Sequence, residues 1–147
     1  MPKLKEVVFQ KGAGTLFDHM TRMQSIARYV VGLWGYERHL EDVLRAVYLS
    51  KADLVTQMVA ELPAMQGFVG SEYALLSKEK ACVCKAIKTH YLPLGEASEL
   101  PQNIEAKLVA LVDKVDLIVS SYHVGYRPTS SKDPLGLRRA MLGVLRL

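Results

Sequence analysis

The chain has 147 residues, of which half are hydrophobic and 23% are charged, and this is the composition of an ordinary globular domain. No apolar run approaches the roughly 18 residues of a transmembrane helix, and the charged N-terminus, with Lys3 and Lys5, lacks the apolar block of a secretory signal. The formal net charge of +4 is compatible with a polyanionic partner but does not require one. We therefore expect one domain, residues 1–147, that works away from membranes.

The sequence contains two cysteines, Cys82 and Cys84. They are too close together for an ordinary disulfide and supply only half of a zinc site. Reduced thiols are typical of cytosolic proteins, so we expect a cytoplasmic protein with two free thiols.

The first part of the chain predicts an extended segment followed by two helices. Residues 4–9 have an extended pattern. Thr15 and Asp18 then have the spacing of a capping box, and apolar residues at helical spacing predict a helix that ends near Gly35. A second helix is predicted over residues 37–49.

Residues 51–70 form the central stretch of the prediction. Its apolar residues between Leu54 and Leu62 fall on one helical face, and Pro63 ends that helix. Since neither Gly nor Pro separates this helix from the one before it, the two helices can form one continuous helix. Asp53 lies at the head of the buried face, where a carboxylate needs a metal ion, hydrogen-bond donors or a basic neighbour.

The second half of the chain adds four helical patterns. They cover residues 71–76, 80–90 and 103–122, and a last helix that Asp133 and Pro134 open as N-cap and first turn. Residues 125–132 form a loop rich in Gly, Pro, Ser and Thr. We therefore predict an all-α fold, a compact bundle of about seven helices. The last residues are still in helical register, and for that reason we expect a piece of a longer protein.

Four sequence blocks carry a family likeness: residues 51–59 with 65–67 and 73–74, residues 90–93, residues 110–116, and residues 131–147. With these blocks in this order, the chain from about Val8 to its last residue resembles the β subunit of the bacterial two-subunit glycine–tRNA ligase. That β subunit is several times longer than this chain. In some bacteria it is fused to the α subunit, so the resemblance implies a fragment of either a separate or a fused subunit.

The resemblance implies a fold and a division of labour. In that family this region is similar to an HD domain, a helical fold first known from metal-dependent phosphohydrolases, so the expected bundle is HD-domain-like. Glycine and ATP, with Mg²⁺, are handled by the α subunit, and no cofactor is expected in this chain. The implied partners are tRNA(Gly), the α subunit and the remaining β-subunit domains, with an anticodon-binding part beyond Leu147.

An active HD phosphohydrolase needs a histidine on its first helix, an adjacent His-Asp pair and a later aspartate, which converge on one or two divalent ions. The resemblance places His19 at the first position, Ala52 and Asp53 at the pair, and Asp113 at the last position. Because the methyl group of Ala52 cannot ligate a metal, we expect these positions to be degenerate. We therefore expect no metal and no catalytic residue.

Two alternatives remain for His19, Asp53 and Asp113. A surviving metal-dependent phosphohydrolase would rely on His19, Asp53 and Asp113. Alternatively, the two carboxylates are kept because they bond neighbouring helices, with Lys51 or Lys114 as a partner. The other histidines are expected at the surface or in packing: His39, His90 and His123.

Basic residues near the C-terminus are the candidates for RNA contact: Arg127, Lys132, Arg138 and Arg139. Arg and Lys side chains bind phosphate oxygens and position RNA without reading its sequence. Alternatively, these side chains pair with acidic residues or dock the next domain.

The function we predict is that of a non-catalytic helical domain that helps to hold tRNA near its acceptor arm while the α subunit activates glycine. The alternatives are a metal-dependent HD-type phosphohydrolase and a purely structural spacer.

Overall fold

The computed structural model describes residues 2–129 and 132–147, and every regular element within them is a helix. The α-helices are α1 (Leu16–Leu33), α2 (Leu40–Leu49), α3 (Gln57–Glu61), α4 (Phe68–Leu76), α5 (Ala81–Thr89), α6 (Ile104–His123) and α7 (Leu137–Arg146). Short 3₁₀ helices accompany them: η1 (Pro2–Lys5), η2 (Glu37–His39), η3 (Ala52–Val55) and η4 (Pro63–Met65). The prediction of an all-α fold with about seven helices is confirmed.

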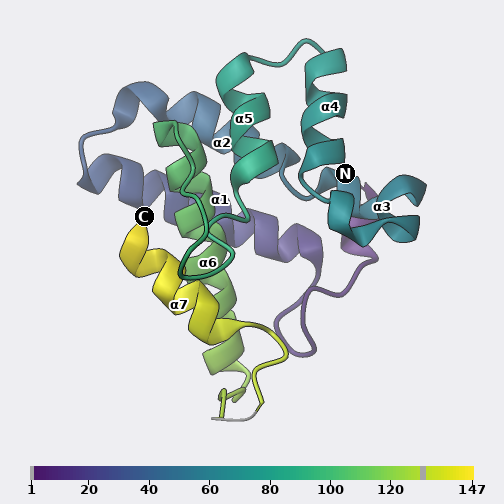
Figure 1. Cartoon of the computed structure of the whole chain (residues 1–147), viewed down its shortest axis with the longest axis vertical. Coiled ribbons are helices and arrows are strands. Elements are labelled where there is room, and N and C mark those ends of the chain that lie inside the picture. The colour runs from purple at the N-terminus through teal and green to yellow at the C-terminus, as the bar shows by residue number, and fades with distance from the viewer. Residues whose placement is uncertain (1, 130–131) are drawn as a thin grey trace.

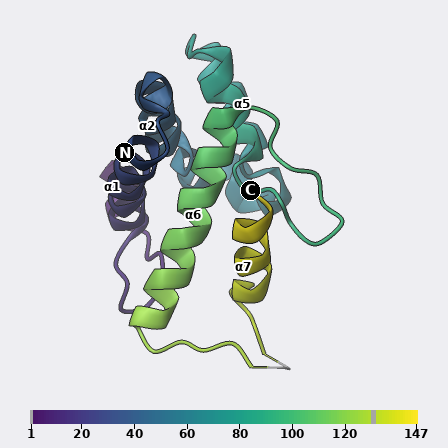
Figure 2. The same ribbon diagram turned by 90° about the vertical axis from the view of Figure 1, so that its left-hand side faces the viewer.

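Helix α6 lies in the middle of the bundle and contacts α1, α2, α5 and α7 (Figure 1). In the turned view, α7 runs beside α6 on one side, and α1 and α2 lie on the other (Figure 2). The core consists of apolar side chains from α1, α2, α5 and α6, with Ala74 from α4, and includes the fully buried Met23, Val31, Val47, Ile87 and Val112. Burial of such a side chain contributes about 1.5–3 kcal/mol to folding. In the part of the chain that the structure describes, no helix combines the length and apolar character needed to cross a bilayer.

The start of α1 follows the sequence pattern closely. Thr15 is the N-cap, and its hydroxyl oxygen accepts a hydrogen bond from the Asp18 backbone N–H at 3.3 Å. The Asp18 carboxylate accepts one from the Thr15 backbone N–H at 2.8 Å. This reciprocal pair confirms the predicted capping box, and α1 ends two residues before Gly35, as predicted.

The central stretch differs from its prediction. Instead of one helix over 54–62, the chain forms η3, an extended residue Thr56 with ψ 149°, and then the short α3. The Thr56 hydroxyl accepts a hydrogen bond from the Val59 backbone N–H at 3.3 Å and donates to the Asp53 carbonyl oxygen at 2.6 Å. This hydroxyl makes Thr56 the N-cap of α3, so it breaks the apolar face into two pieces. The possible continuation of α2 into this stretch is wrong, because α2 ends at Leu49.

Both ends of the chain also differ from their predictions. The extended prediction for residues 4–9 is wrong at its start, where Pro2–Lys5 form η1, and the later part makes one isolated bridge between Val8 and Thr15. The last helix begins later than predicted. The Asp133 carboxylate does accept hydrogen bonds from the backbone N–H groups of Leu137 and Arg138, at 2.8 and 3.0 Å, but α7 starts only after a left-handed residue at position 136.

Helices α6 and α7 approach closely at Gly143. A Cβ atom at this position would lie 2.7 Å from Cε of Lys114, so a side chain larger than hydrogen would displace that lysine. The Lys114 ammonium donates hydrogen bonds to the carbonyl oxygens of Tyr91 and Leu92, at 3.0 and 2.9 Å. The buried lysine thereby joins α6, α7 and the loop that follows α5.

Candidate functional site

A buried group of charged side chains lies where α1 meets α6. His19 of α1 is 1% exposed, and the ring of Phe9 stacks on it with 4.0 Å between centroids. Its Nδ1 lies 2.5 Å from Asp116 Oδ2, and its Nε2 lies 2.9 Å from Asp113 Oδ1. Burial disfavours the charged imidazole, but the hydrogen bonds to Asp113 and Asp116 outweigh it and raise the pKa of His19. The imidazolium therefore donates from both nitrogens to two carboxylates of α6.

Lys51 brings a second cation to Asp113. Its ammonium lies 3.0 Å from Asp113 Oδ1 and 4.2 Å from the centroid of the Tyr91 ring, and the residue is only 4% exposed. Burial opposes charge on both partners. The attraction between them nevertheless raises the pKa of Lys51 and holds the pKa of Asp113 far below its usual range. The pair is therefore ionised in the interior.

His90, the C-cap of α5, completes the surroundings of the lysine. Its Nδ1 lies 2.7 Å from the Ile87 carbonyl oxygen, and its Nε2 lies 2.9 Å from the Lys51 ammonium. Burial, followed by the charge of Lys51, lowers the pKa of His90 to about 3. The ring is therefore neutral, with its proton on Nδ1 and an Nε2 lone pair that accepts from Lys51. The expectation that His90 serves packing is consistent with its complete burial.

Asp116 has its own cation in Arg22 of α1. The Arg22 guanidinium donates to both Asp116 oxygens, at 2.7 and 3.0 Å, and to the Ala13 carbonyl oxygen at 3.0 Å. Burial disfavours the ionised carboxyl, but the hydrogen bonds from His19 and Arg22 lower the pKa of Asp116. Asp116 is not among the predicted site residues, although it lies three residues after Asp113 and therefore on the same face of α6.

Asp53 does not join this group. Its Oδ2 accepts hydrogen bonds from the backbone N–H groups of Gly67 and Gly70, at 2.6 and 3.1 Å, at the start of α4. The residue is 1% exposed, and its Oδ1 has no hydrogen-bond partner among the described residues. Of the three routes open to this buried carboxylate, the structure uses backbone donors, at the helix end where a negative charge is favoured. Ala52 lies beside it on the wall of a cavity of about 190 Å³.

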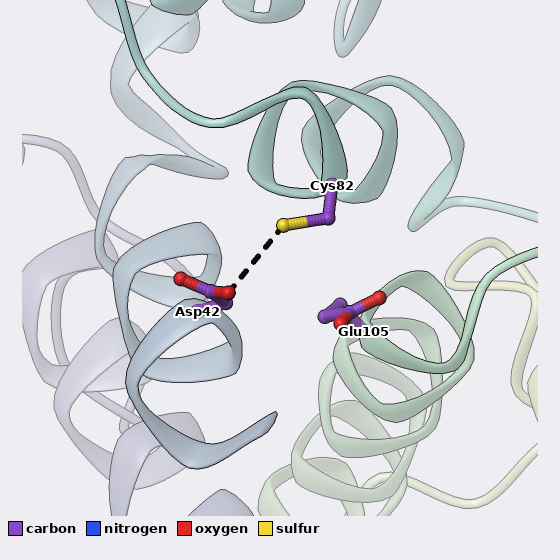
Figure 3. A group of neighbouring side chains, drawn as sticks. All are labelled: Asp42, Cys82 and Glu105. Atoms are coloured by element: carbon purple, nitrogen blue, oxygen red, sulfur yellow. Dashed lines mark hydrogen bonds between the residues drawn. The ribbon is translucent and has the colours of Figure 1, made fainter. Parts of the chain in front are cut away.

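A second group of ligand-type side chains lies between α2, α5 and α6. Figure 3 shows Asp42, Cys82 and Glu105, whose ligand atoms lie within 4.8 Å of one another, the one such set found among the described residues. Their carboxylate oxygens already have partners. The Lys80 ammonium lies 2.7 Å from Asp42 Oδ1, and the Cys82 thiol donates to Asp42 Oδ2 at 3.5 Å. On the other side, His39 Nδ1 lies 2.7 Å from Glu105 Oε1, and the Asn103 side-chain amide donates to Glu105 Oε2 at 2.7 Å.

This second group is therefore a hydrogen-bonded junction between helices. Burial and the hydrogen bond to Asp42 raise the pKa of the Cys82 thiol, which keeps it protonated, whereas a metal-bound cysteine is a thiolate. Cys84 points elsewhere, toward the Glu79 carbonyl oxygen at 3.8 Å, and both thiols are free as predicted.

The candidate RNA-contacting residues lie along the C-terminal loop and α7. Arg127, Lys132, Arg138 and Arg139 are all exposed. Arg127 donates to the carbonyl oxygens of Tyr122 and Tyr126, at 2.7 and 2.9 Å, so much of its donor capacity fixes the loop. Arg139 lines a cleft of about 340 Å³ between α6 and α7, to which Asp113 and Lys114 also contribute.

The sequence matches a known family along its whole length. Residues 1–147 match the family described as glycyl-tRNA synthetase beta subunit. The chain belongs to this family.

Curated relatives agree with this assignment. The glycine–tRNA ligase beta subunit of Pseudomonas putida (strain W619) is 45% identical over 145 residues, which is 99% of this chain. The beta subunits of Coxiella burnetii (strain Dugway 5J108-111) and Stutzerimonas stutzeri (strain A1501) are 42% and 44% identical, over 100% and 99% of this chain. The chain spans 21% of the length of each of these relatives. The family resemblance drawn from the four sequence blocks is thereby confirmed.

The residues that the family resemblance places at the HD positions do not fit a divalent ion. His19 and Asp113 meet, but both nitrogens of His19 face carboxylates, and Asp53 is turned toward the start of α4. The position beside Asp113 that a cation would take is filled by the ammonium of Lys51. Of the two lysines considered as partners, Lys51 pairs with Asp113, whereas Lys114 binds backbone carbonyls. The arrangement is that of carboxylates which join helices.

Proposed function

We propose that this chain is a non-catalytic, tRNA-contacting part of a glycine–tRNA ligase beta subunit. The observation that carries the proposal is the distribution of charge. Residues 126–147 contain five basic residues and one acidic residue, a net charge of +4, which equals the formal net charge of the whole chain. A concentrated positive segment attracts the phosphate backbone of RNA by releasing its counterions. Family membership makes tRNA(Gly) the RNA to test.

The basic residues have different parts in this proposal. Lys132, Arg138 and Arg139 lie exposed and supply phosphate contacts near the acceptor arm. Arg127 shapes the loop, because its guanidinium donates to two backbone carbonyl oxygens. Asp133, the acidic residue of the segment, binds the first backbone N–H groups of α7, where it stabilises the helix that presents the arginines.

The reaction itself takes place elsewhere in this proposal. ATP, Mg²⁺ and glycine are bound by the α subunit, and this chain holds no cofactor and no catalytic residue. Its partners are tRNA(Gly), the α subunit and the other beta-subunit domains, in the cytoplasm. Support comes from the residues that the resemblance places at the HD positions, because the Lys51 ammonium lies beside Asp113 where a divalent ion would have to bind.

A salt-dependent binding titration tests the proposal. Labelled tRNA(Gly) is titrated with the chain by fluorescence anisotropy at several salt concentrations, because phosphate contacts weaken steeply as salt rises. Arg138→Gln and Arg139→Gln should each lower affinity and reduce the salt slope by about 1. Lys85→Gln, at an exposed position of α5, is the matched control and should leave both unchanged. The proposal fails if the chain does not bind tRNA at low salt, or if the arginine variants behave like the control.

A further inference from the structure

The cleft between α6 and α7, which run side by side (Figure 2), is lined by a buried lysine that forms no ion pair with a carboxylate of the described residues. Lys114 is 6% exposed, and its ammonium donates to the carbonyl oxygens of Tyr91 and Leu92, at 3.0 and 2.9 Å. Burial lowers the pKa of Lys114 to about 8, so the group is still mostly charged near neutral pH. An ammonium has three N–H donors, and these two bonds leave one of them without a partner. A buried charge is costly unless it is paired, so this lysine lacks an anion.

Arg139 brings a second cation to the edge of the same cleft. A Cβ atom at Gly136, which also lines the cleft, would lie 2.9 Å from Nη2 of Arg139, so the guanidinium itself lies at this edge. In the described part of the chain this guanidinium has no ion pair and no hydrogen bond, unlike that of Arg138, which lies 3.7 Å from Asp133. Its N–H donors match the oxygens of a phosphate group in two-point fashion.

Asp113, the one acidic residue among the described residues that line the cleft, does not offset these cations. The Lys51 ammonium lies 3.0 Å from its Oδ1 and forms its ion pair. The neighbouring carboxylate, Asp116, has its own ion pair with Arg22 at 2.7 Å. Because these two carboxylates are already balanced by two other cations, the charges of the lysine and the arginine in the cleft remain in excess.

We propose that the cleft is a phosphate-binding site, in which Arg139 and Lys114 hold one phosphate group between α6 and α7. A phosphate group supplies both missing features, because it carries negative charge and presents several acceptor oxygens to the unpaired N–H donors. The cleft volume of about 340 Å³ lies at the lower end of the range for small-ligand pockets, about 300–1,000 Å³. The choice of phosphate over carboxylate rests on the proposed function, since RNA offers phosphate groups. The phosphate belongs either to the tRNA backbone or to a free phosphate compound, and the test separates these two sources.

Nuclear magnetic resonance of the isotope-labelled chain tests the proposal, with the backbone amides of Gly136 and Gly143 as reporters. Gly136 lies beside the Arg139 guanidinium, and Gly143 lies against Lys114. Inorganic phosphate, tRNA(Gly) and, as a control anion, acetate are added separately at constant ionic strength. Both amides should shift with phosphate or with tRNA(Gly) and should stay in place with acetate. Shifts with tRNA(Gly) alone assign the phosphate to the RNA backbone, and shifts with inorganic phosphate alone assign it to a free phosphate compound.

Variants of the two cations sharpen the test. Arg139→Gln, at an exposed position, should weaken phosphate binding about tenfold. Lys114→Met keeps the length of the buried stem and should abolish the shift at Gly143, and if this variant does not fold, Arg139→Gln decides alone. Lys107→Gln, which lies on α6 but outside this cleft, is the matched control and should bind phosphate like the parent.

The proposal is overturned if neither phosphate nor tRNA(Gly) shifts the two amides, if acetate shifts them as far as phosphate does, or if Arg139→Gln titrates like the parent. Its failure is distinguishable from that of the proposed function. If tRNA(Gly) binds while neither it nor phosphate moves these amides, the cleft is excluded and the tRNA contact stands. If phosphate moves them while tRNA(Gly) does not bind, the tRNA contact is excluded and the cleft stands.

Discussion

Two aspartates, the buried Asp53 and the partly buried Asp113, show two ways in which one small bundle holds a carboxylate away from solvent. Asp113 is neutralised by charged side chains, Lys51 and His19, that reach it from distant parts of the chain. Asp53 is held by the backbone N–H groups of Gly67 and Gly70, which belong to the next helix along the chain. Removing Asp113 therefore leaves the Lys51 ammonium without its carboxylate, whereas removing Asp53 leaves only unbonded amides.

The largest effect is expected from Asp113→Ala. This variant leaves the buried Lys51 ammonium without its carboxylate, and breaking a buried ion pair by removing one partner costs about 3–5 kcal/mol. The free energy of unfolding, measured by denaturant titration, should fall by that amount. Asp113→Ala combined with Lys51→Met should recover a large part of the loss. A single variant as stable as the parent would show that the ion pair is not a stabilising element.

A smaller loss is expected from Asp53→Ala. Two backbone N–H groups lose their acceptor, but Asp53 lines a cavity from which water can reach them, so we expect a total loss near the lower end of the about 1–3 kcal/mol that one unsatisfied buried donor costs. Amide hydrogen exchange should quicken at Gly67 and Gly70 before it does elsewhere in α4. Asp53→Asn, which keeps an acceptor oxygen, should retain most of the protection. Equal exchange in both variants would contradict the role of this side chain at the start of α4.

The pH dependence of stability separates the two histidines beside Asp113. The folded-state pKa of His90 is about 3, below the unfolded value of about 6.5, so its contribution to stability is present above pH ~6.5 and is lost as the pH falls toward 3. The loss amounts to about 1.4 kcal/mol per pH unit in that window. His90→Gln, whose amide oxygen can still accept from Lys51, should flatten the curve of unfolding free energy against pH.

The contribution of His19 to the pH dependence of stability has the opposite sign. Its folded-state pKa is raised, so its contribution is present below the unfolded pKa of about 6.5 and is lost as the pH rises through the folded value. His19→Gln should therefore change the alkaline side of the same curve. Identical pH profiles for the two variants would contradict the charge states assigned to these rings.

The smallest effect is expected from Asp133→Ala. The first two backbone N–H groups of α7 lose the Asp133 carboxylate that accepts their hydrogen bonds, and the loss of such a helix-start acceptor costs about 1 kcal/mol. Circular dichroism should show a slightly lower unfolding temperature. Asp133→Asn, a good capping residue, should restore most of it, and an Asn variant as unstable as the Ala variant would exclude capping as the cause.

The sequence predicts best what is decided within a few residues of the chain. The capping box at Thr15 and Asp18, the periodicity of α1 and α6, and the all-α class depend on local spacing. The break at Thr56 could not be predicted in the same way. The apolar spacing continues across this residue, although its hydroxyl caps the next helix. Local pattern and local hydrogen bonding compete at this residue, and the hydrogen bond prevails.

The buried charge group was predictable only in part. The family resemblance predicts that His19 and Asp113 belong to one site, and in the structure His19 Nε2 lies 2.9 Å from Asp113 Oδ1. That Lys51 turns toward Asp113 while Asp53 turns away depends on the path of the chain through η3, which no spacing in the sequence reveals. His90 is recognised as a partner only when α5 is packed on the bundle, because 39 residues separate it from Lys51.

Gly143 ties the outer surface of the molecule to its interior. With only a hydrogen atom at this position, α7 rests directly on Lys114, one residue after Asp113, and the helix cannot slide along α6 without lifting that lysine from its two carbonyl oxygens. Arg138 and Arg139 lie on this helix, so the contact at Gly143 helps to set their place on the bundle.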